Sequence, residues 1–168
     1  MDADGRLRIY LNDHLAASVV GREIASRVVA RDRGSALGAF LAGYVADAAR
    51  EREMLLAVMR RVGATRQPYK EVAARVAERI GRLKPNGQLR GHSPLSRLIE
   101  IESLLELLRA SRSVWLALEA LDDPRLAGLD LRERLLRATA EAEELERIGI
   151  DAAPAALGEP RRGPAALG

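Results

Sequence analysis

The sequence contains no cysteine, which excludes a disulfide scaffold, a thiolate metal centre, an iron–sulfur cluster and a cysteine nucleophile. Aromatic residues make up only 3% of the chain, which is too few for the stacking platforms of single-strand binders and unlike a β-sandwich. No uncharged stretch approaches the ~20 apolar residues that span a bilayer. The first eight residues are charged and polar. We therefore expect no signal peptide, no membrane association and a cytoplasmic protein.

The residues that are present favour an all-α fold. The chain has 168 residues, of which 48% are hydrophobic and 30% charged, and this balance is typical of one globular domain. Apolar residues recur at helical spacing and no strand pattern survives. We expect a bundle domain over residues 1–150 and a flexible low-complexity tail over 151–168, where Pro-Ala-Ala-Leu-Gly occurs twice. Four long helices are predicted, over residues 5–31, 36–62, 93–121 and 130–149.

Local signals predict where these helices begin and end. Each begins after a polar residue that can cap the first turn; the expected caps are Asp4, Ser35, Ser93 and Asp130. Gly149 is the expected end of the last helix. Between the second and third helices lies a connection of about thirty residues, in which Pro68 can open a short helix ending at Gly81.

Two predicted helix seams carry polar residues near their middles. The seam of the first helix contains His14 and reads Tyr10, His14, Ala17, Gly21, Ile24 and Val28. The seam of the second contains Glu51 and reads Leu37, Leu41, Tyr44, Ala48, Glu51, Leu55, Val58 and Val62. The third helix is the richest in leucine, so we expect it to be central.

Two hairpins of long helices joined by one long connection resemble the ferritin-like superfamily over residues 5–148. The resemblance rests on helix lengths, on the connection and on polar residues in the seams. It implies a four-helix up-down bundle with a long crossover, containing a short helix, between the second and third helices. Metal-binding members of that superfamily carry Glu-x-x-His on two helices, and this motif occurs nowhere in the sequence.

The polar seam residues still allow a single metal site. His14, Glu51, Asp47 (one turn before Glu51) and Glu102 of the third helix are the candidate ligands. Imidazole and carboxylate suit iron, manganese or zinc. The alternative is that His14 and Glu51 form a buried hydrogen-bonded pair that fixes the register of the helices.

Positive charge is concentrated in residues 60–97, which carry ten basic residues against two acidic ones. Such a segment can bind an anion or a nucleic-acid backbone, and its candidate residues are Arg75, Arg79, Arg82, Lys84 and Arg90. The missing aromatics and the missing helix-turn-helix pattern disfavour nucleic acid. Alternatively, these cations pair with residues 98–150, which carry twelve acidic residues against seven basic ones.

The sequence thus favours a non-enzymatic bundle that serves as an assembly or interaction scaffold. We expect a homodimer that can also bind a protein partner and that has no cofactor. The alternatives are a ferritin-like protein with one transition metal ion inside the bundle, and an anion-binding or nucleic-acid-binding protein that uses residues 60–97.

Overall fold

The computed structural model describes residues 1–67 and 93–158. Four long helices pack against one another, and the described residues contain no strand, as predicted for an all-α protein. None of the described helices is long and apolar enough to cross a membrane. The helices are α1 (Ala3–Arg31), α2 (Ala36–Arg61), α4 (Pro94–Leu121) and α5 (Leu131–Leu157), with a 3₁₀ turn, η1 (Pro124–Leu126), before α5.

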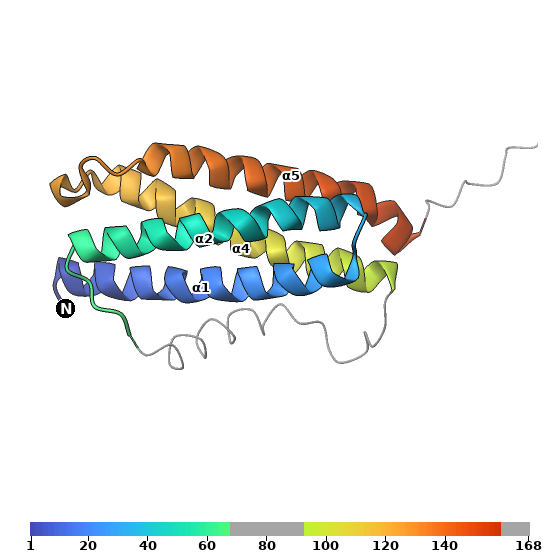
Figure 1. Cartoon of the computed structure of the whole chain (residues 1–168), viewed down its shortest axis with the longest axis horizontal. Helices are drawn as coiled ribbons and strands as arrows, with labels where there is room; N and C mark the ends of the chain where they lie inside the picture. The colour runs from blue at the N-terminus through green and yellow to red at the C-terminus, as the bar shows by residue number, and fades with distance from the viewer. Residues whose placement is uncertain (68–92, 159–168) are drawn as a thin grey trace, which may run out of the picture.

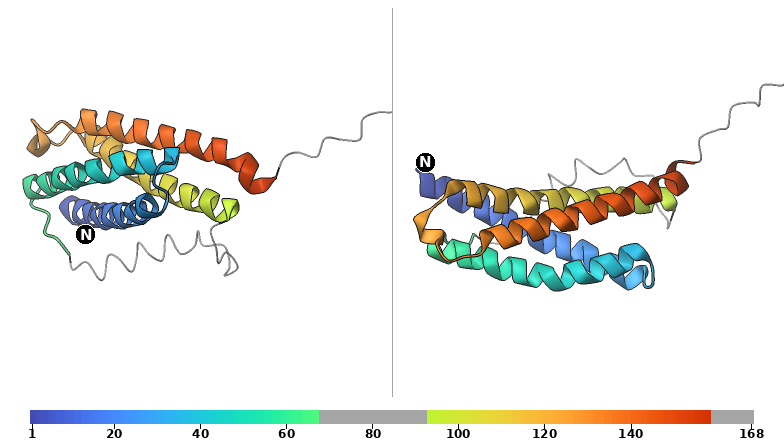
Figure 2. Two further views of the ribbon diagram at one scale, coloured as in Figure 1. Left: turned by 45° about the vertical axis from the view of Figure 1, so that its right-hand side comes forward. Right: turned by 90° about the horizontal axis from the view of Figure 1, so that it is seen from above.

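The helices form two antiparallel hairpins, α1–α2 and α4–α5 (Figure 1). Each helix contacts its hairpin partner, while α1 also contacts α4 and α2 also contacts α5. The helices α2 and α4 lie diagonally and run in the same direction, so α2 ends and α4 begins at opposite ends of the bundle (Figures 1 and 2). The predicted short helix of the connection lies outside the described residues.

Three of the four predicted helix caps are confirmed: Ser35, Ser93 and Asp130 each accept a hydrogen bond from a backbone N–H in the first turn of their helices. The first helix is capped by Asp2 instead of Asp4. The Asp2 carboxylate accepts from the Gly5 N–H at 2.7 Å. Asp2 has an extended backbone, as a cap requires, whereas Asp4 lies inside the helix.

The helix α5 runs beyond its predicted end at Gly149 and continues to Leu157. Gly149 faces α4, where a Cβ atom would lie 3.2 Å from Ile101 Cγ2. This glycine therefore permits close packing of two helices and does not stop one. Residues 151–157 belong to α5, and the rest of the predicted tail, 159–168, lies outside the described residues. Alanine-rich sequence sustains the last turns, although they contain Pro154.

Most of the buried apolar residues form two clusters, one toward each end of the bundle. The cluster near the α1–α2 turn is built around Leu41, Leu104 and Leu145. The cluster at the other end is built around Leu11 and Trp115, and includes residues of all four helices. Along α2, the first cluster ends at Ala48 and the second begins at Leu55. Polar side chains therefore occupy the level of the bundle between these two residues.

The predicted seam of the second helix is buried throughout. On α1, Gly21 and Val28 of the predicted seam are buried, but elsewhere the buried line is turned by about one residue from the prediction. Leu11, Leu15 and Ala25 are buried, whereas Tyr10, His14, Ala17 and Ile24 are only partly buried. The reason is that α1 contacts both α2 and α4, so the stripe facing the core lies between its two contact surfaces. Within α4 the leucine-rich face is covered except at Leu121, which is half exposed.

Candidate functional site

Glu51 is the most buried carboxylate in the described part of the chain, with 4% of the residue exposed. It lies on α2 between the two apolar clusters. Its Oε1 accepts hydrogen bonds from the Ser111 hydroxyl and from the Trp115 indole N–H, the latter at 3.3 Å. Both donors belong to α4, so this carboxylate joins the two diagonal helices through the middle of the bundle.

Asp47 lies one turn before Glu51 and faces α5. Its Oδ2 accepts from the Arg137 guanidinium, with Nε at 2.8 Å, and its Oδ1 accepts from Arg50 Nη1 at 2.6 Å. Burial acts to raise the pKa of Asp47, but the two guanidiniums outweigh it and hold that pKa below its ordinary value. Asp47 therefore stays ionised and ties α2 to α5.

A third carboxylate, Glu141 of α5, approaches the same centre with only 15% of its side chain exposed. Burial, followed by the charge of Glu51, raises the pKa of Glu141 from 4.5 to about 7, against an opposing effect of Arg134. Burial, followed by the charges of Glu51 and Glu141, also raises the pKa of the Tyr44 phenol. Close to neutral pH, Glu141 can therefore take up or release a proton.

The centre encloses a small cavity of about 10 Å³, lined among others by His14, Tyr44, Glu51 and Ser111. A volume of this order holds about one water molecule. It can equally hold one metal ion, but no organic cofactor or substrate. The Tyr44 hydroxyl reaches this level because Gly21 has no side chain; a Cβ there would lie 2.9 Å from that hydroxyl.

Of the predicted metal ligands, the structure brings His14 and Glu51 to one cavity. His14 also packs edge-on against the Tyr10 ring, with 4.5 Å between the ring centroids. Asp47 is held by arginines, and Glu102 is exposed on α4. Within residues 1–67 and 93–158, no three histidine, aspartate or glutamate side chains are grouped so that they could hold a metal.

The predicted anion-binding residues Arg75, Arg79, Arg82, Lys84 and Arg90 all lie outside the described residues. The prediction missed the two α4 side chains that donate to Glu51, Ser111 and Trp115. A carboxylate in an apolar seam indicates that donors must face it. Which side chains donate to Glu51 depends on how α4 packs across the bundle, and the local sequence does not determine this packing.

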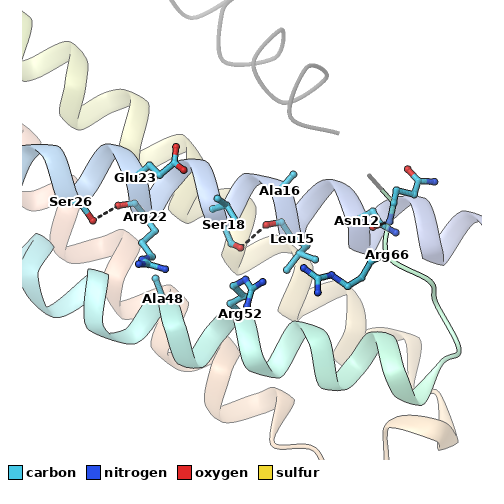
Figure 3. Close-up of a pocket in the computed structure, with 12 residues that line it drawn as sticks. Asn12, Leu15, Ala16, Ser18, Arg22, Glu23, Ser26, Ala48, Arg52 and Arg66 are labelled. Atoms are coloured by element: carbon cyan, nitrogen blue, oxygen red, sulfur yellow. Dashed lines mark hydrogen bonds between the residues drawn. The ribbon is translucent and has the colours of Figure 1, made fainter. Parts of the chain in front are cut away.

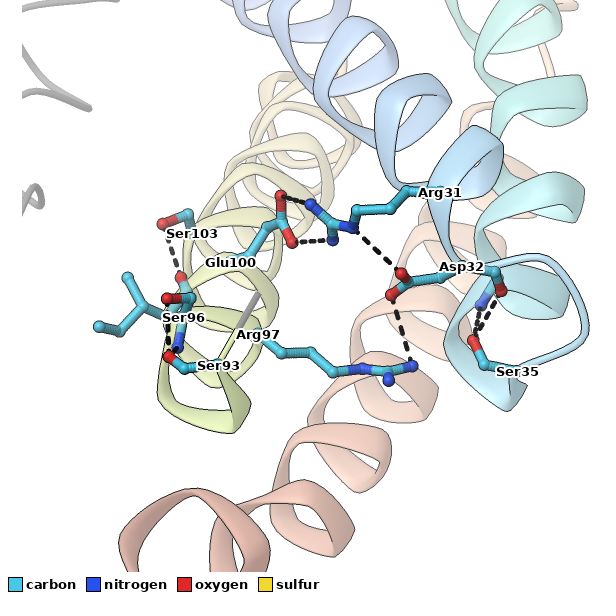
Figure 4. A network of polar contacts seen from close by, with 10 residues as sticks. Arg31, Asp32, Ser35, Ser93, Ser96, Arg97, Glu100 and Ser103 are labelled. Atoms are coloured by element: carbon cyan, nitrogen blue, oxygen red, sulfur yellow. Dashed lines mark hydrogen bonds and ion pairs between the residues drawn. The ribbon is translucent and has the colours of Figure 1, made fainter. Parts of the chain in front are cut away.

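A second polar network closes the end of the bundle where α1 ends and α4 begins (Figure 4). Arg31 forms a two-pronged pair with Glu100, at 2.5 Å for Nη2–Oε2 and 3.3 Å for Nη1–Oε1. Asp32 accepts from Arg31 Nε at 3.1 Å and pairs with Arg97 of α4 at 3.5 Å. The arginines that line the adjoining cavity of about 700 Å³ already have carboxylate partners. This network therefore holds the helices together and leaves no unpaired arginine among the described residues at that cavity.

Comparisons of the chain with family models, with curated proteins and with solved structures find no match.

Proposed function

We propose that the protein is a non-enzymatic scaffold that assembles as a homodimer through the outer surface shared by α4 and α5. The interior supports a structural role, because its polar residues bind one another. Glu51 is held by two donors of α4, and Asp47 by two guanidiniums. Such networks fix which helices pair and in what register.

The observation that carries the proposal is a pair of exposed leucines, Leu116 and Leu136, which are 45% and 62% exposed. Leu116 follows Arg112 by four residues, and Leu136 precedes Thr139 by three, so helical periodicity places each beside a residue that bridges the two helices. Three such bridges cross this surface and set the register of the helices: Arg109 with Glu146, Arg112 with Thr139, and Arg132 with Glu119. The leucines thus form an apolar centre with a polar rim, the usual anatomy of a protein interface.

The charges around this centre suit a second copy of the same chain. Along α4, Arg109 and Arg112 precede Leu116, and Glu119 follows it. A two-fold axis in the plane of the interface, perpendicular to the helices, reverses the helix direction. It sets Arg112 of one copy opposite Glu119 of the other. The surface is therefore complementary to itself in charge as well as apolar at its centre.

Light scattering or sedimentation equilibrium over a range of concentrations tests this proposal. We expect a dimer whose dissociation constant rises at least tenfold in Leu116→Arg and in Leu136→Glu, with helix content unchanged by circular dichroism. Leu157→Glu is the matched control, because Leu157 is at least as exposed as the two leucines but lies at the far end of α5. A wild-type protein that is monomeric at every concentration, or a dimer unaffected by both variants, would overturn the proposal.

The shared cavity of His14 and Glu51 favours a second function, the binding of one transition metal ion inside the bundle. An imidazole and a carboxylate would be its protein ligands, with iron, manganese or zinc as the fitting metals. Equilibrium dialysis against zinc and manganese tests this idea. Stoichiometric binding lost in His14→Ala but kept in Glu102→Gln, a control whose side chain is exposed, supports it. Absence of binding, or equal binding by His14→Ala, rules it out.

A further inference from the structure

A cavity of about 470 Å³ lies between α1 and α2, away from the surface proposed for dimerisation. Three arginines line it from three different segments: Arg22 from α1, Arg52 from α2 and Arg66 from the residues that follow α2. Figure 3 shows their guanidinium groups directed into the space between the two helices. The fold therefore gathers three cations that are far apart in the sequence.

Arg66 is held at this cavity by a buried side chain. Asn12 of α1 is only 3% exposed. Its amide nitrogen donates to the Arg8 and Thr65 carbonyls, at 2.8 and 3.1 Å, and its amide oxygen accepts from the Gln67 N–H at 2.8 Å. The residues on both sides of Arg66 are thus fastened to α1. A surface arginine that simply trails in solvent needs no such anchor.

Few carboxylates reach these three guanidiniums, whereas half of the other arginines in the described ranges pair with one. Within the described ranges, neither Arg22 nor Arg66 has a carboxylate within 4.0 Å, and Arg52 reaches only the exposed Glu53, at 3.5 Å. Elsewhere in the same ranges, Arg31 and Arg109 pair with carboxylates of a neighbouring helix at 2.5 and 2.8 Å. Glu23 also lines the cavity, but its carboxylate points away from the guanidiniums (Figure 3). Like charges left together without counter-charges favour an external anion.

We propose that this cavity binds a small polyanion that carries phosphate groups. Each guanidinium offers a planar fork of donors that matches phosphate oxygens, and three forks can hold more than one phosphate group at once. The volume lies in the ordinary range of small-molecule sites, roughly 300–1,000 Å³. The proposal is independent of the dimer, because its residues belong to the α1–α2 hairpin and the segment that follows it.

Isothermal titration with inorganic pyrophosphate at low ionic strength tests the proposal. We expect one site per chain, an affinity that falls as salt is added, and at least a tenfold loss in each of Arg22→Gln, Arg52→Gln and Arg66→Gln. Arg27→Gln and Arg60→Gln are matched controls, because both arginines are exposed on the same two helices but lie outside the cavity. These controls should bind as the wild type does.

Two further measurements make the result decisive. The variant Asn12→Ala keeps all three arginines but releases the segment that carries Arg66 from α1, so we expect it to bind pyrophosphate more weakly. Adding Arg66→Gln to this variant should weaken binding little further. Citrate at the same ionic strength should bind at least tenfold more weakly than pyrophosphate. No binding at low salt, equal losses in the control variants, or citrate binding as tightly as pyrophosphate would each overturn the proposal.

Discussion

The polar centre of the bundle and the arginine cavity both gather charged side chains, but they balance these charges differently. In the centre, each of the two buried α2 carboxylates, Glu51 and Asp47, accepts hydrogen bonds from side chains of other helices. In the cavity, Arg22 and Arg66 meet no carboxylate within the described residues. Charges that satisfy one another stabilise a fold, whereas charges of one sign gathered at an open cavity favour a ligand. Substitutions in the centre should therefore change stability, and substitutions in the cavity should change binding.

The largest effect is expected from Trp115→Ala. Trp115 is fully buried in one apolar cluster, and its indole N–H donates to Glu51. Truncating a buried tryptophan costs about 3–5 kcal/mol, which denaturant unfolding followed by circular dichroism will measure. Leu157→Ala, at an exposed position at the end of α5 and outside the proposed dimer surface, should change the unfolding free energy by about 0.5 kcal/mol or less. A loss in Trp115→Ala no greater than that in Leu157→Ala would contradict a stabilising centre.

An intermediate effect is expected from the titration of Glu141. Its pKa is raised from an ordinary 4.5 to about 7, so the folded state holds the proton more tightly than the unfolded state. This contribution to stability is complete below about pH 4.5 and is lost as the pH rises through about 7. The free energy of unfolding should fall across this range by at most about 3 kcal/mol, since one pKa unit corresponds to about 1.4 kcal/mol.

Glu141→Gln should abolish that fall, because glutamine carries no ionisable proton. Glu143→Gln is the matched control, as Glu143 is exposed on the same helix. Unfolding curves collected between pH 4.5 and 7.5 avoid most of the acid titration of Asp47, whose pKa is shifted downward and whose contribution is lost only as the pH falls. A pH dependence in Glu141→Gln that matches the wild type would refute the assignment.

The smallest change in stability is expected from Arg22→Gln. Arg22 is exposed and has no ion-pair partner within the described ranges, so its removal should alter the unfolding free energy by about 0.5 kcal/mol or less. The same variant should lose pyrophosphate binding. Thermal denaturation with and without pyrophosphate measures both quantities. A marked destabilisation without ligand would mean that the cavity, like the centre, serves the fold.

Features set by neighbouring residues were predicted well from the sequence. Ser35, Ser93 and Asp130 cap their helices as expected, because a cap depends on a side chain and an N–H three residues away. The buried seam of the second helix was also predicted throughout, with Glu51 in its middle. The start of α1 and the end of α5 were not, because both depend on competition between alternatives: two aspartates can cap α1, and Gly149 can either end a helix or admit a neighbour.

The candidate site was predicted only in part. His14 and Glu51 were expected at one level of the bundle, and they line one cavity. The donors to Glu51 and the guanidiniums at Asp47 were not expected, since Ser111 and Arg137 lie 60 and 90 residues away from their acceptors. No local pattern links positions at such separations, and only the packing of α4 and α5 on α2 brings them together.

By itself, then, the sequence determined that the chain is helical, lacks thiol chemistry, has few aromatics and carries a histidine and a carboxylate in two helix seams. These properties follow from composition and from the 3.6-residue period of the α-helix, which relates residues that are close together in the sequence. Tertiary structure decided which polar groups satisfy each other and which are left for a ligand. The physical reason is that a charge is stabilised by what lies within a few ångströms of it, and the pairing of helices sets those distances.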